Sequence, residues 1–232
     1  MAITKWLHLE ERRGDQWLLP IYSAISNAQF EGKCKAIDID TREMGVYIST
    51  KLNIITHVII RMNEGVSKIH EKIKDHEDLH VFTKLQQGYA FPIDDPLKYQ
   101  LIADIETFLF QMNATWELIK KFIAKIYTHA GYATSRKNSA PIIKVVHENN
   151  NQNTDWFPLL DKNRNFIAHE GAIYLAVDVS DQDNWDLLII KKNLMDFELK
   201  DLFFTQSDLV NIYQGFLIAK SLIQTDLIEL YQ

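Results

Sequence analysis

The sequence predicts a mainly α-helical domain, a bundle of about four long helices with a β-hairpin inserted near residues 172–191. Glycine and proline are scarce, with 8 and 5 in 232 residues, whereas a β-sandwich or barrel needs many tight turns. Apolar residues recur at steps of three and four over long stretches, which is typical of amphipathic helices. After Gly171 this helical spacing stops and two short apolar runs follow, which favours strands there.

The amino-terminal half predicts two long helices. We expect a single domain over 1–232, with 1–40 as an irregular extension that holds a short helix near 17–30 and a strand at 33–39. The first long helix begins at Thr41, and its apolar positions continue to Ile73. Asp94 or Asp95 caps the second, which continues to about His129 before Gly131 ends it.

The carboxyl-terminal half predicts two more helices around the hairpin. Residues 132–153 are polar and predict a connector with a short strand at 142–146. Thr154 or Asp155 caps a helix that ends near His169. The runs AIYLAVDVS and NWDLLIIKK, separated by DQD, form the hairpin. A last helix covers about 207–230.

Composition restricts the class of protein. A hydrophobic share of 47% with 24% charged residues is ordinary for a globular protein. The single cysteine, Cys34, excludes an internal disulfide framework and fits a reducing compartment. No run approaches the roughly 18 apolar residues that span a bilayer, and the amino terminus has no apolar core of the signal-peptide type. We therefore expect a cytoplasmic protein without a membrane segment.

The net charge of −6 argues against a large non-specific RNA surface. Any RNA contact would have to be local. The cations available for it are Arg136 and Lys137 with Lys144, or Lys191 with Lys192, and one of these groups would have to lie near the candidate site.

One stretch, His76-Glu77-Asp78-Leu79-His80, matches the zinc-peptidase pattern H-E-x-x-H. Two histidines four residues apart on a helix can share a zinc ion, and Glu106 could be a third ligand. Asp78 would lie where such helices face the core, and a buried carboxylate is costly unless it is paired. The stretch is better explained as a solvated, charged end of a helix, so we expect no metal or cofactor.

The second candidate site is DKNRNFIAHEG, residues 161–171. On a helix, Asn165 and His169 lie one turn apart on nearly the same face. Arg164 lies about 140° from His169, but its long side chain can reach that face. A guanidinium can bind a phosphate and stabilise its charge, and a histidine can exchange a proton near neutral pH. Asn165 could hold either the histidine or the phosphate.

These residues also have a purely structural explanation. Arg164 could pair with Asp161 or Glu170 on the surface, while His169 packs against a neighbouring helix. Other histidines in the helices, His57 and His129, are best explained as packed side chains. Cys34 has no histidine in its own segment, which argues against a thiol nucleophile.

The stretch LLDKNRNFIAHEG resembles the signature of the HEPN superfamily (higher eukaryotes and prokaryotes nucleotide-binding). That family is a helical bundle in which a core helix carries R-x4-6-H, often with a polar residue after the arginine. Arg164, Asn165 and His169 match those positions. The resemblance is tightest over 156–171 and extends loosely, through the helix pattern, over 41–231.

The resemblance implies a metal-independent endoribonuclease that cleaves by 2′-hydroxyl attack, with Arg164, Asn165 and His169 as catalytic residues. It also implies a homodimer with two facing motifs, and a toxin–antitoxin or other defence system that supplies the partner. Family members silenced by nucleotidyl transfer have a tyrosine two residues after the histidine; here that residue is Gly171, and the nearest tyrosine is Tyr174. The alternative is a non-catalytic HEPN-like interaction module, and a zinc peptidase at His76 and His80 is a third hypothesis.

Overall fold

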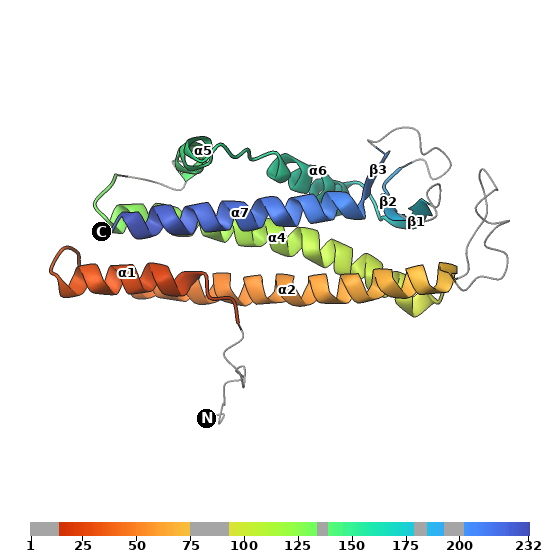
Figure 1. Cartoon of the computed structure of the whole chain (residues 1–232), viewed down its shortest axis with the longest axis horizontal. Helices are drawn as coiled ribbons and strands as arrows, with labels where there is room; N and C mark the ends of the chain where they lie inside the picture. The colour runs from red at the N-terminus through yellow and green to blue at the C-terminus, as the bar shows by residue number, and fades with distance from the viewer. Residues whose placement is uncertain (1–13, 75–92, 134–138, 179–184, 193–201) are drawn as a thin grey trace, which may run out of the picture.

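The fold is mainly helical, as the sequence predicts. The computed structural model describes residues 14–74, 93–133, 139–178, 185–192 and 202–232. Within these ranges three helices are long, and Figure 1 shows them running along the molecule: α2 (Ile39–Lys74), α4 (Asp95–His129) and α7 (Gln206–Glu229). Three helices are shorter: α1 (Leu18–Phe30), α5 (Ser139–Asn149) and α6 (Trp156–His169). The expectation of about four long helices is thus met only roughly.

Helices α2 and α4 form the largest helix pair, and apolar residues on both contribute to one core. An ion pair joins them across this interface. Asp104 of α4 is 2% exposed, and Arg61 of α2 donates to its Oδ1 from Nη2 at 2.5 Å and from Nε at 3.1 Å. Gln100 donates to the other carboxylate oxygen at 3.1 Å. The buried carboxylate is therefore fully partnered, as a buried charge requires.

The short helix predicted near 17–30 is present as α1, and this helix belongs to the bundle. Ile21 and Ile25 are buried, and α1 packs against α7. The preceding residues are tied to α7 as well: the Trp17 indole donates to the carbonyl of Lys220 at 2.7 Å, and Lys220 Nζ lies 2.6 Å from Asp15 Oδ2.

The strand predicted at 33–39 is wrong. Residues 31–38 are a turn and an irregular segment that leads into α2. Its last residue, Asp38, caps that helix: Oδ1 accepts the backbone N–H of Thr41 at 2.8 Å, and Oδ2 accepts the Thr41 hydroxyl at 2.8 Å. The segment is short, and the Asp–x–x–Thr cap commits its end to a helix.

The strand predicted at 142–146 is also wrong, because these residues form the middle of α5. The run of apolar and β-branched residues suggests a strand. However, the buried residues Ser139, Ile143, Val146 and His147 follow the three- and four-residue spacing of a helix. Tertiary packing against α4 and α7 decides between the two patterns.

The predicted hairpin is present, but it belongs to a sheet of three strands. Strand β1 (Tyr174–Asp178) pairs antiparallel with β2 (Asp186–Ile190), with Tyr174 opposite Ile190. Strand β3 (Phe203–Thr205) pairs with the other edge of β2. Thr205 then caps α7 through a reciprocal bond with Asp208. The sheet lies at the end of the bundle opposite the carboxyl-terminal residues (Figure 1).

Helix α6 packs against α4 and α7 through an aromatic cluster. The Trp156 ring lies at 78° to that of Trp116, with centroids 4.9 Å apart, and at 80° to that of Phe216. Gly215 of α7 makes room for it, because a Cβ added there would collide with Cβ and Cγ of Trp156. None of the described helices is both long and apolar enough to cross a bilayer.

The cap of α2 can be tested by substitution. We expect Asp38→Ala to lower the free energy of unfolding by about 1 kcal/mol, the usual effect of losing an N-cap, and Asp38→Asn to lower it by much less. The bonds from Thr41 hold the pKa of Asp38 below its ordinary value. The stabilisation is therefore present above the ordinary aspartate pKa and is lost as the pH falls. Urea unfolding at neutral and acidic pH measures both effects; equal stability of Asp38→Ala and wild type would contradict them.

The close approach of α6 and α7 allows a matched pair of variants. Gly215→Ala should lower the free energy of unfolding by about 1–3 kcal/mol, because the added methyl group displaces Trp156. Gly65→Ala, also within a helix, meets its nearest atom, Leu101 Cδ1, at an ordinary 3.4 Å. It should raise stability by up to about 1 kcal/mol through the better helix propensity of alanine. Denaturant unfolding compares them; a Gly215→Ala protein as stable as Gly65→Ala would refute this account of the contact.

Candidate functional site

The predicted site residues lie on α6, whose length and amphipathic pattern agree with the sequence. Trp156, Leu160, Asn163 and Phe166 form its buried face at helical spacing. The helix ends at His169, where the backbone N–H of Glu170 donates to the carbonyl of Phe166 at 2.8 Å. Arg164 and Asn165 are half-buried beside this face, and His169 is exposed at the end of the helix.

Arg164 and Asn165 come together, and they do so on a third residue. Nη2 of Arg164 donates to Oδ1 of Asp161 at 2.7 Å, and Nδ2 of Asn165 donates to Oδ2 of the same carboxylate at 3.0 Å. Nε of Arg164 is buried and has no hydrogen-bond partner among the described residues. The guanidinium and the amide therefore converge on one point, which Asp161 occupies.

His169 does not join this cluster through a hydrogen bond. Within the ranges that the structure covers, its imidazole has no hydrogen-bond partner, so Asn165 does not hold it. Of the structural explanation offered by the sequence, one part is present, because Arg164 pairs with Asp161; His169 is exposed rather than buried. The imidazole is open to solvent and to any ligand on this face.

The end of strand β2 brings two lysines to α6. Lys191, only 9% exposed, donates to Oδ1 of the buried Asn163 at 3.2 Å, one residue from Arg164 in the chain. Lys192 pairs with Glu170 at 2.5 Å, next to His169, and its Nζ lies 5.6 Å from the centre of the Phe166 ring. The hydrogen bond from Lys192 holds the pKa of the exposed Glu170 carboxyl below its ordinary value. Of the local cations that the sequence offers, Lys191 and Lys192 are therefore at the motif.

Of the other candidate cations, only Lys144 lies in the described part of the chain. Lys144 pairs with Glu148 along α5 at 3.6 Å. Arg136 and Lys137 lie outside the described residues, as do His76, Glu77 and His80. Among the described residues, no three histidine, cysteine, aspartate or glutamate side chains gather closely enough to hold a metal ion.

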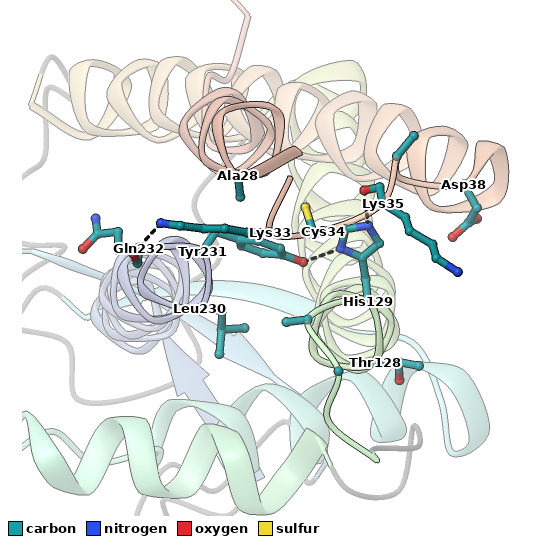
Figure 2. Close-up of a pocket in the computed structure, with 13 residues that line it drawn as sticks. Ala28, Lys33, Cys34, Lys35, Asp38, Thr128, His129, Leu230, Tyr231 and Gln232 are labelled. Atoms are coloured by element: carbon teal, nitrogen blue, oxygen red, sulfur yellow. Dashed lines mark hydrogen bonds between the residues drawn. The ribbon is translucent and has the colours of Figure 1, made fainter. Parts of the chain in front are cut away.

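A second polar cluster lies at the opposite end of the bundle, in a pocket of about 580 Å³. Figure 2 shows its lining, from the segment between α1 and α2, the end of α4 and the end of α7. His129 is its centre: Nδ1 lies 2.7 Å from the Tyr231 hydroxyl, and Nε2 lies 3.0 Å from the carbonyl of Lys35. No local motif in the sequence signals this cluster, because its residues come from three distant segments.

The bonds in this pocket indicate structural roles for its polar groups. Both ring nitrogens of His129 are engaged, so the imidazole is packed and satisfied, as the sequence suggests. The Cys34 thiol donates to the carbonyl of Ile25 at 3.7 Å. Burial raises the pKa of the Tyr231 hydroxyl, which also lies 3.3 Å from the carbonyl of Ile126. The cluster connects the α1–α2 segment to the ends of two long helices.

No family model, curated protein or solved structure matches this chain. The resemblance to the HEPN superfamily therefore rests on the residues of α6 and on the helical architecture.

Tyr231→Phe tests the hydrogen bonds of the pocket. We expect a loss of about 1 kcal/mol in the free energy of unfolding, because Nδ1 of the half-buried His129 loses its partner. Tyr132→Phe is the control, since Tyr132 is 55% exposed and should change stability little. Thermal and urea unfolding of both variants give the comparison, and an unchanged Tyr231→Phe protein would show that the hydroxyl contributes no net stability.

Proposed function

We propose that this chain is an HEPN-like endoribonuclease that cleaves RNA without a metal ion, with Arg164 and His169 as its catalytic residues and Asn165 in support. The observation that carries the proposal is the position of Lys191 and Lys192, which follow β2 and contact the two ends of the motif at Asn163 and Glu170. A protein with a net charge of −6 needs a local cationic surface to hold a phosphate backbone. Lys192 and Arg164 supply surface cations beside an exposed histidine, and the buried Lys191 adds a positive charge beneath them.

The proposed reaction is an internal transfer of the phosphoryl group. His169 takes the proton of a ribose 2′-hydroxyl, and the 2′-oxygen attacks the adjacent phosphorus. The bond from phosphorus to the 5′-oxygen breaks, leaving a 2′,3′-cyclic phosphate and a 5′-hydroxyl. Arg164 binds the non-bridging oxygens and stabilises the charge that develops on them.

The leaving 5′-oxygen needs a proton, and each chain has only one such histidine on α6. The resemblance suggests a homodimer in which two motifs face each other, so the imidazolium of a second copy can donate that proton. The same resemblance suggests a toxin–antitoxin or defence system, with a neighbouring protein as inhibitor. A second copy of the chain and an inhibitor protein are therefore its proposed partners.

A second function, a non-catalytic interaction module, is favoured by one observation. Asp161 neutralises Arg164 and also occupies Asn165, which is how a purely structural motif would be arranged. The acidic net charge points the same way.

Cleavage of labelled tRNA and mRNA in excess EDTA separates the two functions. We expect wild-type protein to cleave and His169→Ala or Arg164→Ala to be at least about a hundredfold slower, the usual effect of losing an acid–base or charge-stabilising group. His57→Ala and Arg42→Ala are the controls, because both residues are exposed on α2; the prediction that His57 is packed was wrong. Substrates with 2′-deoxyribose at the cleaved positions should not react.

The results distinguish the two functions when circular dichroism shows that all variants are folded alike. Cleavage lost in both α6 variants and kept in both α2 variants supports the ribonuclease. Equal cleavage by all variants indicates a contaminating nuclease or another site. The absence of cleavage by every protein favours the interaction module.

A further inference from the structure

The carboxylate of Asp161 is held as a phosphate would be held. Two donors on the next turn of α6 bind its two oxygens separately, Arg164 at Oδ1 and Asn165 at Oδ2. Carboxylates and phosphates offer similar pairs of acceptor oxygens to a guanidinium, and both form charge-assisted bonds with it. The residues proposed to bind the scissile phosphate are therefore already occupied by an anion of the same chain.

The contact is one that a substrate could replace. The Asp161 side chain is 41% exposed, so this is a surface ion pair, and such pairs are weak. Arg164 uses only Nη2 in the pair. A phosphate backbone that also contacts Lys192 can offer several bonds in exchange for one carboxylate.

We propose that Asp161 competes with the substrate. Its carboxylate occupies the donor groups of Arg164 and Asn165 in the free protein, and a backbone phosphate of single-stranded RNA displaces it on binding. This inference rests on the proposed function, because it uses the same residues. Asp161 therefore weakens binding at this site, and only a strand whose phosphates contact several of the cations at once can displace its carboxylate.

The opposite role for Asp161 is to orient the guanidinium for the substrate. The two roles predict opposite effects of removing its charge. A competitor leaves a tighter site when it is neutralised, whereas an orienting residue leaves a weaker one. The sign of the change therefore decides between them.

The experiment measures binding of a fluorescent 2′-O-methyl single strand, which lacks the attacking hydroxyl, by anisotropy over a series of salt concentrations. The proteins are wild type, Asp161→Asn, Arg164→Gln and the double variant. Glu148→Gln is the matched control, because Glu148 is also an exposed helical carboxylate, paired with Lys144. It loses the same charge at a distance from α6.

We expect Asp161→Asn to bind roughly tenfold more tightly at low salt, the effect of one more charged hydrogen bond to the strand. The slope of log K against log salt should steepen by about 0.7, the contribution of one more phosphate contact on a single strand. Glu148→Gln should bind like wild type. The double variant should bind no more tightly than Arg164→Gln alone, because Arg164 is the group that Asp161 occupies.

Other outcomes overturn the inference in distinguishable ways. If Asp161→Asn binds equally or more weakly while Arg164→Gln still weakens binding, Asp161 is an orienting residue and the proposed RNA site stands. If Glu148→Gln gains as much as Asp161→Asn, the effect is one of net charge and the inference is wrong. If no protein binds the strand even at low salt, the proposed function fails and the inference fails with it.

Discussion

The packing of Trp156, the first residue of α6, against Gly215 of α7 is the contact on which the candidate site depends. Helix α6 has only 14 residues, and helices of that length are marginal in water without tertiary packing. Its first residue is inserted against Trp116 and Phe216, at a point where α7 has a glycine. Since this contact sets the rotation of α6 about its axis, it also decides that Asn163 and Phe166 face the core and that His169 faces solvent.

The sheet gives the second half of the site its position. Strand β2 is the central strand, paired on both edges, and the chain leaves it at Lys191 and Lys192, whose backbone N–H groups both donate to the carbonyl of Leu202. The lysines are thus held by their backbone as well as by Asn163 and Glu170. Because β3 leads directly into the capped start of α7, the same helix that seats Trp156 also anchors the sheet. The cations and the motif are therefore both placed by contacts with the amino-terminal half of α7 and the strand that leads into it.

The sequence indicated those parts of the fold that have a single strong periodicity. Helices α2, α4, α6 and α7 and the hairpin follow from spacing and turn residues. The failures have local causes: residues 142–146 are β-branched yet helical, and the segment before Asp38 is too short and too close to a cap to be a strand. The contact of Trp17 with Lys220 and the cluster of His129 with Tyr231 join residues about 200 and 100 positions apart, which no local pattern contains. At the candidate site, the sequence predicts the residue types. It does not predict that Arg164 and Asn165 both donate to the carboxylate of Asp161, because that depends on side-chain conformations.

The docking of α1 on α7 has a consequence for how the chain matures. Trp17 donates to a carbonyl 203 residues later, so the contact between α1 and α7 cannot form until α7 has left the ribosome. At the usual speeds of synthesis this delay is on the order of ten seconds or more. During that time α1 can already contact the earlier helices, because Tyr22 packs on Phe122 of α4 and donates to the carbonyl of Thr41 in α2. Helices α2 and α4 lie close together in the chain and can pair as soon as both are made, so the order of synthesis favours a bundle in which the contact between α1 and α7 forms last.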